Sequence, residues 1–292
     1  MKILNLIEDT KGRSDLTNAH GLSFYIETKM HKIILDLGPS EDTIHNARIL
    51  GVDLAEVDTV ILSHGHYDHS GGIIPFTKIN DKAIIYMQDN VTKEYYADDG
   101  QNAIERYRYI GIDKDISKLS QVRFVNGDFK IDDELELFVI NNKKHEIPFT
   151  NRRLLVKEGD TFKQDDFNHE HFLVVHQNGK SYLMSGCAHN GMLNIIEEYI
   201  DRYGTAPDVV VSGFHLAKKK EYSENEVEEI RALAEELKKY PTRFVTCHCT
   251  GMKAFELMKE IMGDKLEYVH TGEEINMSHV ENVITNGHHK NN

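Results

Sequence analysis

The segment that most constrains this chain is Ser63-His64-Gly65-His66-Tyr67-Asp68-His69-Ser70-Gly71-Gly72. It carries three histidines and one aspartate within six consecutive positions, and it directly follows the apolar run from Val57 to Leu62. A β-branched apolar run of this kind predicts a buried strand, and the glycines after the histidines predict a turn. The segment therefore predicts a strand that delivers several imidazole groups and a carboxylate to one place.

These side chains suit a transition-metal ion better than calcium, because neutral imidazole and ionised carboxylate are ligands for zinc, iron or manganese. His64 and His66 are two positions apart, so an extended or looped backbone can aim both rings at one ion. Asp68 and His69 follow after the turn and are placed to meet a second ion beside the first. The alternative is a polar loop that is rich in histidine by chance, and four ligand groups at a strand end argue against it.

The same residues resemble the signature of a known family. The pattern His-x-His-x-Asp-His after a strand, continued by Ser-Gly-Gly, is similar to that of the metallo-beta-lactamase superfamily. The resemblance implies an α/β fold of the α+β kind, namely an αββα sandwich with a one- or two-metal site at one edge of its paired sheets. The length of 292 residues is compatible with one such domain over 1–292.

Residues 89–120 interrupt the expected sandwich. They are polar and rich in tyrosine, and they include the paired acids Asp98 and Asp99. We interpret them as a helical insertion over the mouth of the site, a lid that supplies specificity, because insertions often carry specificity in loop-built sites. The alternative is a solvated surface excursion. Further along, Ser223 with Glu226 predicts a capping box at the start of an acidic amphipathic helix.

Two later loops provide the remaining candidate ligands, and both follow segments with strand character. The first is Ser185-Gly186-Cys187-Ala188-His189-Asn190-Gly191, in which we expect His189 to be the third ligand of the first ion. The second is Cys247-His248-Cys249-Thr250-Gly251, where the resemblance places the final ligand, His248. The predicted ligand sets are His64, His66 and His189 for one ion, and Asp68, His69 and His248 for the other.

The three cysteines lie in these two loops. Cys187 stands where many superfamily members have an aspartate that bridges two ions; we expect a small buried residue beneath the site, with a thiolate ligand as the alternative. Cys247 and Cys249 flank His248, so a Cys-His-Cys zinc knot is an alternative; alternation along a continued strand argues against it, because it would point both cysteines away from the direction of the His248 ring. Three cysteines without a paired spacing indicate no disulfide framework and a reducing compartment, the cytoplasm.

Three further residues are candidates for roles beyond simple ligation. The resemblance suggests that Asp36, at the end of a predicted strand, supports the metal loop through a hydrogen bond, with a turn-forming aspartate as the alternative. Asp68 is the only anionic ligand, so we expect it also to act in catalysis by orienting water or relaying its proton. His215 follows a buried strand and has no ligand position left to fill, so we expect it to contact substrate or support a ligand.

Short runs in the chain also resemble a narrower branch of the superfamily, the metal-dependent hydrolases similar to dihydropterin ribofuranosylaminobenzene-phosphate synthase. The runs are His20-Gly21-Leu22-Ser23, Ser-Gly-Cys-x-His-x-Gly at 185–191, and Gly213-Phe214-His215-Leu216.

The ligand sets predict two divalent transition-metal ions, most simply zinc, with manganese or iron as alternatives. Three protein ligands per ion leave positions for a shared water, whose pKa the ions would lower towards neutrality. The sequence therefore predicts a metal-dependent hydrolase of a small phosphoester or cyclic ester. The alternatives are a synthase-type transferase, a non-catalytic metal-binding protein, and a di-iron oxidoreductase. The last is disfavoured because the redox branch has glutamate where this chain has His66.

The charge balance limits the partners. The 34 basic and 48 acidic residues give a net charge of −14, which argues against a general binder of nucleic acid or anionic membranes. No apolar run reaches membrane-spanning length, and we expect no signal peptide. We expect a small anionic substrate drawn by the metals or a local positive patch, leave self-association open, and expect residues 288–292 to be a frayed terminus.

Overall fold

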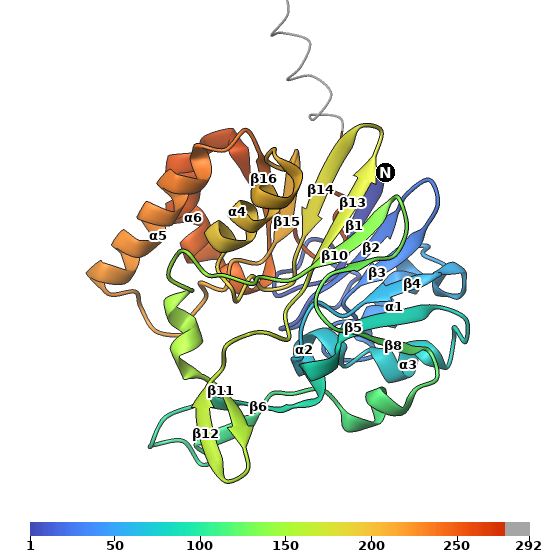
Figure 1. Cartoon of the computed structure of the whole chain (residues 1–292), viewed down its shortest axis with the longest axis horizontal. Helices are drawn as coiled ribbons and strands as arrows, with labels where there is room; N and C mark the ends of the chain where they lie inside the picture. Colours follow the sequence, from blue (N-terminus) through green and yellow to red (C-terminus); the bar gives the residue numbers. More distant parts are fainter. Residues whose placement is uncertain (278–292) are drawn as a thin grey trace, which may run out of the picture.

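The computed structural model describes residues 1–277 and contains two large β-sheets that face each other (Figure 1). Within these residues, the N-terminal sheet has six strands, of which the first three are antiparallel and the others are added in parallel. In spatial order they are β1 (Lys2–Ile7), β2 (Ser23–Glu27), β3 (Lys32–Leu35), β4 (Thr59–Ile61), β5 (Ile84–Gln88) and β8 (Val122–Val125).

The C-terminal sheet has the same division into antiparallel and parallel strands. Strands β9, β10, β13 and β14 pair with one another antiparallel in that order, and β14, β15, β16 and β17 pair in parallel. In spatial order the sheet contains β9 (Phe129–Lys130), β10 (Leu135–Phe138), β13 (Phe172–Gln177), β14 (Lys180–Met184), β15 (Val209–Ser212), β16 (Arg243–Thr246) and β17 (Leu266–Tyr268).

Alternation of side chains along the strands produces the layers. In β13, Leu173 and Val175 pack in the core between the two sheets, whereas Phe172 and Val174 pack against helices. Each sheet has helices on its outer face (Figure 1). They are α4 (Met192–Tyr203), α5 (Glu224–Lys238) and α6 (Met252–Met262) on the C-terminal sheet, and α1 (Asp42–Ile49) and α3 (Ile73–Thr77) on the N-terminal sheet. The predicted αββα sandwich is confirmed.

The expectation of a helical insertion at 89–120 is wrong. These residues form strands, with short 3₁₀ turns at Asp89–Thr92 and Lys114–Lys118, in a small antiparallel sheet below the sandwich in Figure 1. Its strands, in order, are β12 (Thr161–Gln164), β11 (Leu154–Glu158), β6 (Glu94–Asp98) and β7 (Tyr107–Tyr109). In β6, Tyr95 and Ala97 are buried and alternate with partly exposed neighbours, a period of two that favours a strand.

Other predictions concern single elements. The capping box of α5 is confirmed, since Ser223 and Glu226 exchange the expected hydrogen bonds. None of the helices within residues 1–277 combines the length and apolar character needed to cross a membrane. The predicted frayed terminus at 288–292 lies outside the described residues.

The parallel strands determine where the chemistry-bearing loops lie. Strands β3, β4, β14 and β16 end shortly before Asp36, His64, His189 and His248, respectively. Carboxyl ends of parallel strands gather at one edge of a sheet, and both sheets of the sandwich present that edge on the same side. Residues far apart in the sequence are thereby brought within contact distance.

Candidate metal centre

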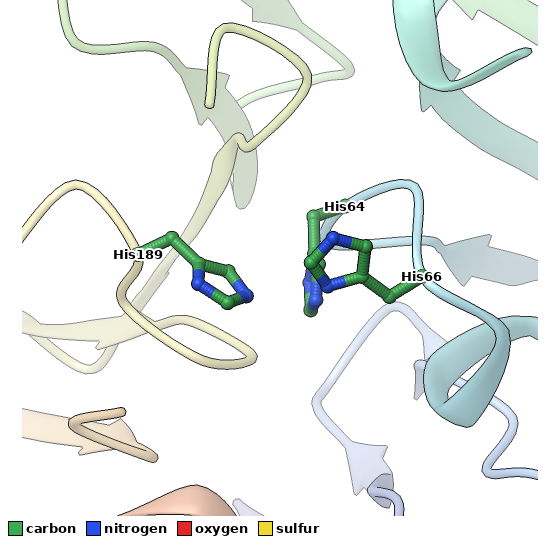
Figure 2. A group of neighbouring side chains, drawn as sticks. All are labelled: His64, His66 and His189. Atoms are coloured by element: carbon green, nitrogen blue, oxygen red, sulfur yellow. The ribbon is translucent and has the colours of Figure 1, made fainter. Parts of the chain in front are cut away.

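Three histidine rings form the first cluster of the site. The ligand nitrogens of His64, His66 and His189 lie within 4.8 Å of one another. Figure 2 shows His189 pointing from its loop towards His64 and His66, which come from the facing loop after β4. All three rings are buried, and among the described residues their Nε2 atoms have no hydrogen-bond partner. Leaving buried polar nitrogens unpaired is costly, so this donor set fits a transition-metal ion.

Neutral groups hold the rings of the first cluster. The Ser63 hydroxyl donates to Asp36 Oδ2 at 2.7 Å and therefore accepts from His64 Nδ1 at 2.8 Å. Asn151 donates to the carbonyl of His189 at 2.7 Å, and its Oδ1 accepts from His189 Nδ1 at 2.9 Å. Both rings thus carry their proton on Nδ1 and leave Nε2 as a bare lone pair.

Burial also keeps these rings neutral. It lowers the pKa of His64 and of His189 well below the ordinary value, and nearby histidines lower it further. Burial lowers the pKa of His66 to about 3. Because a metal ion binds neutral imidazole, the three rings are already in the protonation state that coordination requires.

The second cluster surrounds the carboxylate of Asp68. Its Oδ2 lies 3.7 Å from His69 Nε2 and 3.5 Å from His248 Nε2. His69 Nδ1 donates to Asp36 Oδ2 at 2.7 Å, and His248 Nδ1 is hydrogen-bonded to Asp9 Oδ1. A carboxylate behind an imidazole, with the other nitrogen directed at a common point, is typical of histidines that bind metals.

Charge distinguishes this cluster from the first. Burial alone lowers the pKa of His248, but the Asp9 carboxylate outweighs it and raises that pKa well above the usual range.

Asp36 accepts the backbone N–H of Ser63 at 2.7 Å in addition to the bonds from the Ser63 hydroxyl and His69. The predicted support of the metal loop by Asp36 is therefore confirmed.

The cysteines lie closer to the centre than expected. Cys187 Sγ is 3.1 Å from His69 Nε2, so the thiol stands among the candidate ligands rather than beneath them. Burial raises the pKa of this thiol well above its ordinary value.

Cys249 does not point away from His248: the donor atoms of Cys187, His248 and Cys249 lie within 4.8 Å of one another. The alternation argument fails because β16 ends at Thr246 and the chain turns into a 3₁₀ helix at His248–Thr250. Cys247, in contrast, packs in the core between the sheets.

His215 lies beside the first cluster, as a candidate for contact with substrate requires. Its ring centroid is 4.1 Å from that of His189. The Thr150 hydroxyl donates to the carbonyl of His215 and accepts from its Nδ1 at 2.7 Å, which leaves Nε2 bare. Burial lowers the pKa of His215 to about 3, so the ring is neutral.

Several residues of the site were not assigned from the sequence. Asp9, Asn151 and Glu170 all hold ligand-bearing loops, and His20 contacts Asp68 although it was recognised only as part of a family-like run. Glu170 accepts the backbone N–H groups of His189 and of the residue after it, at 2.8 and 2.9 Å. The available signal was position: Asp9 lies two residues after the end of β1, and Glu170 lies two residues before the start of β13.

Comparison with known proteins identifies relatives of the whole chain. A family model described as the metallo-beta-lactamase superfamily matches residues 16–195. The chain is 28% identical to 7,8-dihydropterin-6-methyl-4-(beta-D-ribofuranosyl)-aminobenzene-5'-phosphate synthase from Methanocaldococcus jannaschii, over 93% of this chain and 95% of that protein. It is 27% identical to an uncharacterised protein of the same organism, with coverage of 92% and 98%.

Solved structures share the fold. One is the crystal structure of a metal-dependent hydrolase of the beta-lactamase superfamily, with a TM-score of 0.78 and 26% identity over 95% of this chain and 99% of the other. Another is Zn²⁺-bound PqqB from Methylobacterium extorquens, with a TM-score of 0.58, 12% identity, and coverage of 95% and 100%. At 12% identity, the comparison with PqqB supports only a shared fold.

Proposed function

The chain belongs to the metallo-beta-lactamase superfamily, and we propose that it is a metal-dependent hydrolase with two metal positions that cleaves a small anionic phosphoester or cyclic ester. One observation carries this proposal. Among the described residues, the buried Nε2 atoms of four histidines have no hydrogen-bond partner, and all four lie in the two clusters. They are His64, His66, His189 and His248.

The residues divide into two ligand sets. His64, His66 and His189 would hold one ion, and Asp68, His69 and His248 the other. Zinc suits this mixture of imidazole and carboxylate, and manganese or iron are alternatives. When bound, such ions supply a water of lowered pKa and polarise the phosphoryl or carbonyl oxygen of an ester.

The chain's own groups would orient the reactants and move protons. Asp68 lies in the second cluster with its Oδ2 near three imidazole nitrogens, where it can orient the attacking water or relay its proton. His215 presents a bare, neutral Nε2, which can accept a hydrogen bond from the substrate or its leaving group. Asp36 and Asn151 keep the ligand rings in fixed orientations, so little reorganisation is needed during the reaction.

Two basic residues, Arg108 in β7 and Arg153 just before β11, support an anionic substrate. Arg108 and Arg153 are both bound to Asp99, at 2.8 and 3.1 Å, so the two guanidinium groups share one carboxylate. Arg108 also contacts Tyr67 within the metal loop, and the charge of Arg153 acts on His215. This local excess of positive charge counters the acidic surface and can attract an anion.

We place the protein in the cytoplasm, where its free cysteines stay reduced.

A second candidate is a synthase-type transfer between a ribofuranosylaminobenzene phosphate and a dihydropterin. It is favoured by the 28% identity, over nearly the whole chain, to the Methanocaldococcus jannaschii protein of that name. The same pair of metal positions can activate a leaving group in either reaction. The two candidates differ in whether water or an organic group takes the place of the leaving group.

Metal analysis combined with turnover tests the proposal. The protein would be freed of metal, reconstituted with zinc, manganese or iron, and assayed with a phosphodiester, a lactone, and the dihydropterin with its phosphate partner. We expect close to two ions per chain and hydrolysis that disappears in the metal-free protein. His66→Ala should lose metal and activity, whereas His45→Ala, on the exposed side of α1, should retain both. A metal-loaded protein that turns over only the dihydropterin pair would establish the synthase; hydrolysis that persists without metal would refute the metal-dependent hydrolase.

A further inference from the structure

His20 lies just before β2, at the edge where the ligands gather. Its Nδ1 is 2.9 Å from Asp9 Oδ2, and its Nε2 is 3.5 Å from Asp68 Oδ2. Its ring centroid is 5.0 Å from that of His248. The side chain is 61% exposed, so unlike the other rings it borders the solvent.

The arrangement of His20 is the same as that of two assigned ligands. In His20, His69 and His248, Nδ1 is bound to a carboxylate, and Nε2 lies within 4 Å of Asp68 Oδ2. In His69 that nitrogen lies closer to Cys187 Sγ, at 3.1 Å. The three distances from Nε2 to this oxygen are 3.5, 3.7 and 3.5 Å. With Nδ1–H donated to the carboxylate, a neutral ring has its lone pair on Nε2.

Two other histidines show the distances that this chain uses when hydrogen bonds alone hold an imidazole ring. His31 bridges Asp58 and Asp132 at 2.8 and 2.6 Å. His169 uses both of its nitrogens at 2.9 and 3.0 Å, in bonds to the Gly65 amide and to a buried carboxylate. All four lengths fall in the ordinary range of about 2.6–3.2 Å for such bonds.

The separation between His20 and Asp68 is longer than these bonds and matches coordination. Two ligand atoms that are each about 2.0–2.2 Å from a tetrahedral ion lie roughly 3.3–3.6 Å apart. The value of 3.5 Å falls within this range, as does the 3.5 Å between His248 and Asp68.

We propose that His20 is a further ligand of the second ion, together with Asp68, His69 and His248. This inference rests on the proposed two-metal function and adds a protein ligand that faces the solvent. Asp9 would then support two ligands of one ion, His20 through Oδ2 and His248 through Oδ1. With four protein ligands, the second ion is bound more firmly and keeps fewer positions for water than the first.

Metal binding to two variants tests the role of His20 directly. His20→Ala removes the ring, and His20→Asn keeps an amide N–H for Asp9 but has no atom that reaches Asp68. Cobalt would be titrated into the metal-free proteins, with its visible absorption and a competing chelator as readouts. We expect both variants to bind one ion as the natural protein does and to bind the other at least about 10-fold more weakly, with altered absorption. His45→Ala should behave as the natural protein, and equal melting temperatures of the metal-free proteins would show that all are folded.

The outcomes separate this inference from the function. If both variants bind two ions with unchanged affinity and absorption, His20 is not a ligand, even if turnover falls. If His20→Ala alone is impaired and His20→Asn is not, the ring acts through Asp9, and the inference is again wrong. If cobalt binding depends on His20 but the natural protein hydrolyses none of the esters, the ligand assignment stands and the proposed function fails. Binding of fewer than two ions by the natural protein would contradict both.

Discussion

The two halves of the metal centre hold their histidines by different means. In the first cluster, a hydroxyl and an amide, from Ser63 and Asn151, hold His64 and His189. In the second, the carboxylates of Asp36 and Asp9 hold His69 and His248. A carboxylate behind a ring makes its free nitrogen a stronger donor, whereas a neutral partner fixes only its direction. The orientation of the ligand rings therefore depends on shape and burial in the first half, and on charged hydrogen-bond partners in the second.

The halves also differ in their access to solvent. The histidine ligands His64, His66 and His189 are at most 5% exposed, and His69 and His248 are at most 1% exposed. Only the second half has solvent-bordering groups beside its ligands, namely Asp9 and His20, with side chains 32% and 61% exposed. A chelator should therefore reach the second ion first. The following changes test the contrast, from the largest expected effect to the smallest.

Removal of one ligand from each half should have the largest effect. His66→Ala should empty the first position, and His248→Ala the second, each with a loss of turnover above the roughly 10–100-fold typical of supporting residues. Elemental analysis should find about one ion per chain in each variant. If His66→Ala keeps both ions and full activity, the first ligand set is wrong.

Exchanging the supports should alter the two halves in opposite directions. Asp9→Asn keeps the shape but removes the charge behind His248, so the second ion should bind roughly 10–100-fold more weakly. Asn151→Asp places a carboxylate behind His189, which should tighten the first ion. Chelator competition on both variants measures this. Equal effects of Asp9→Asn on the two ions would contradict the contrast.

His215 should affect the rate without affecting either ion. It contacts no ligand except through its position beside His189, and its Nδ1 is held by Thr150. His215→Ala should leave two ions bound and lower turnover by about 10–100-fold, the range of an acid–base or outer group. Loss of an ion in this variant, with retention in His248→Ala, would mean that the two roles are exchanged.

His31 provides the same kind of carboxylate support away from the metal centre, and its effect should be the smallest. Burial lowers the pKa of His31, but Asp58 and Asp132 outweigh it and raise that pKa above 6.5. The contribution of the protonated ring to stability should thus be complete below the unfolded pKa of about 6.5 and be lost as pH rises through the higher folded value.

Melting curves across this pH window measure the effect of His31. The loss should be about 1 kcal/mol or less, because the pair is partly exposed. His31→Gln should remove the pH dependence, and His45→Ala should keep it. A natural protein whose stability increases through the window would give the opposite sign.

The parts of the centre that were predictable from the sequence are local. Four candidate ligands follow one strand within a single short loop, so their spacing alone indicates shared ligation. They are His64, His66, Asp68 and His69. The supports could not be predicted in this way. Asp9 is 239 residues from His248 and is brought into place by the packing of the two sheets. Asn151 is 38 residues from His189 and reaches it from the 3₁₀ turn at Phe149–Arg153.

The errors in the fold prediction also come from distant pairing. The tyrosine-rich residues around β6 look like a polar excursion until β11, some 60 residues later, pairs with them. Cys249 was misplaced because β16 ends at Thr246, before the cysteines and His248, whereas the alternation argument assumes that the strand continues through them. The α5 helix was predicted correctly because its cap and its apolar side are both local.

The distance in sequence between Asp9 and His248 has a consequence for how the protein is made. The backbone N–H groups of Glu8 and His248 are bound, respectively, by Thr271 and by Glu8 itself, so the first and last strands are joined beneath the second cluster. A nascent chain emerges from the ribosome with its N-terminal part first. It therefore exposes the segment 64–69 long before His248 exists, and the second ion can be bound in its final form only after almost the whole chain has been synthesised. Uptake of that ion should mark the end of folding, and a chain truncated before β16 should lack it.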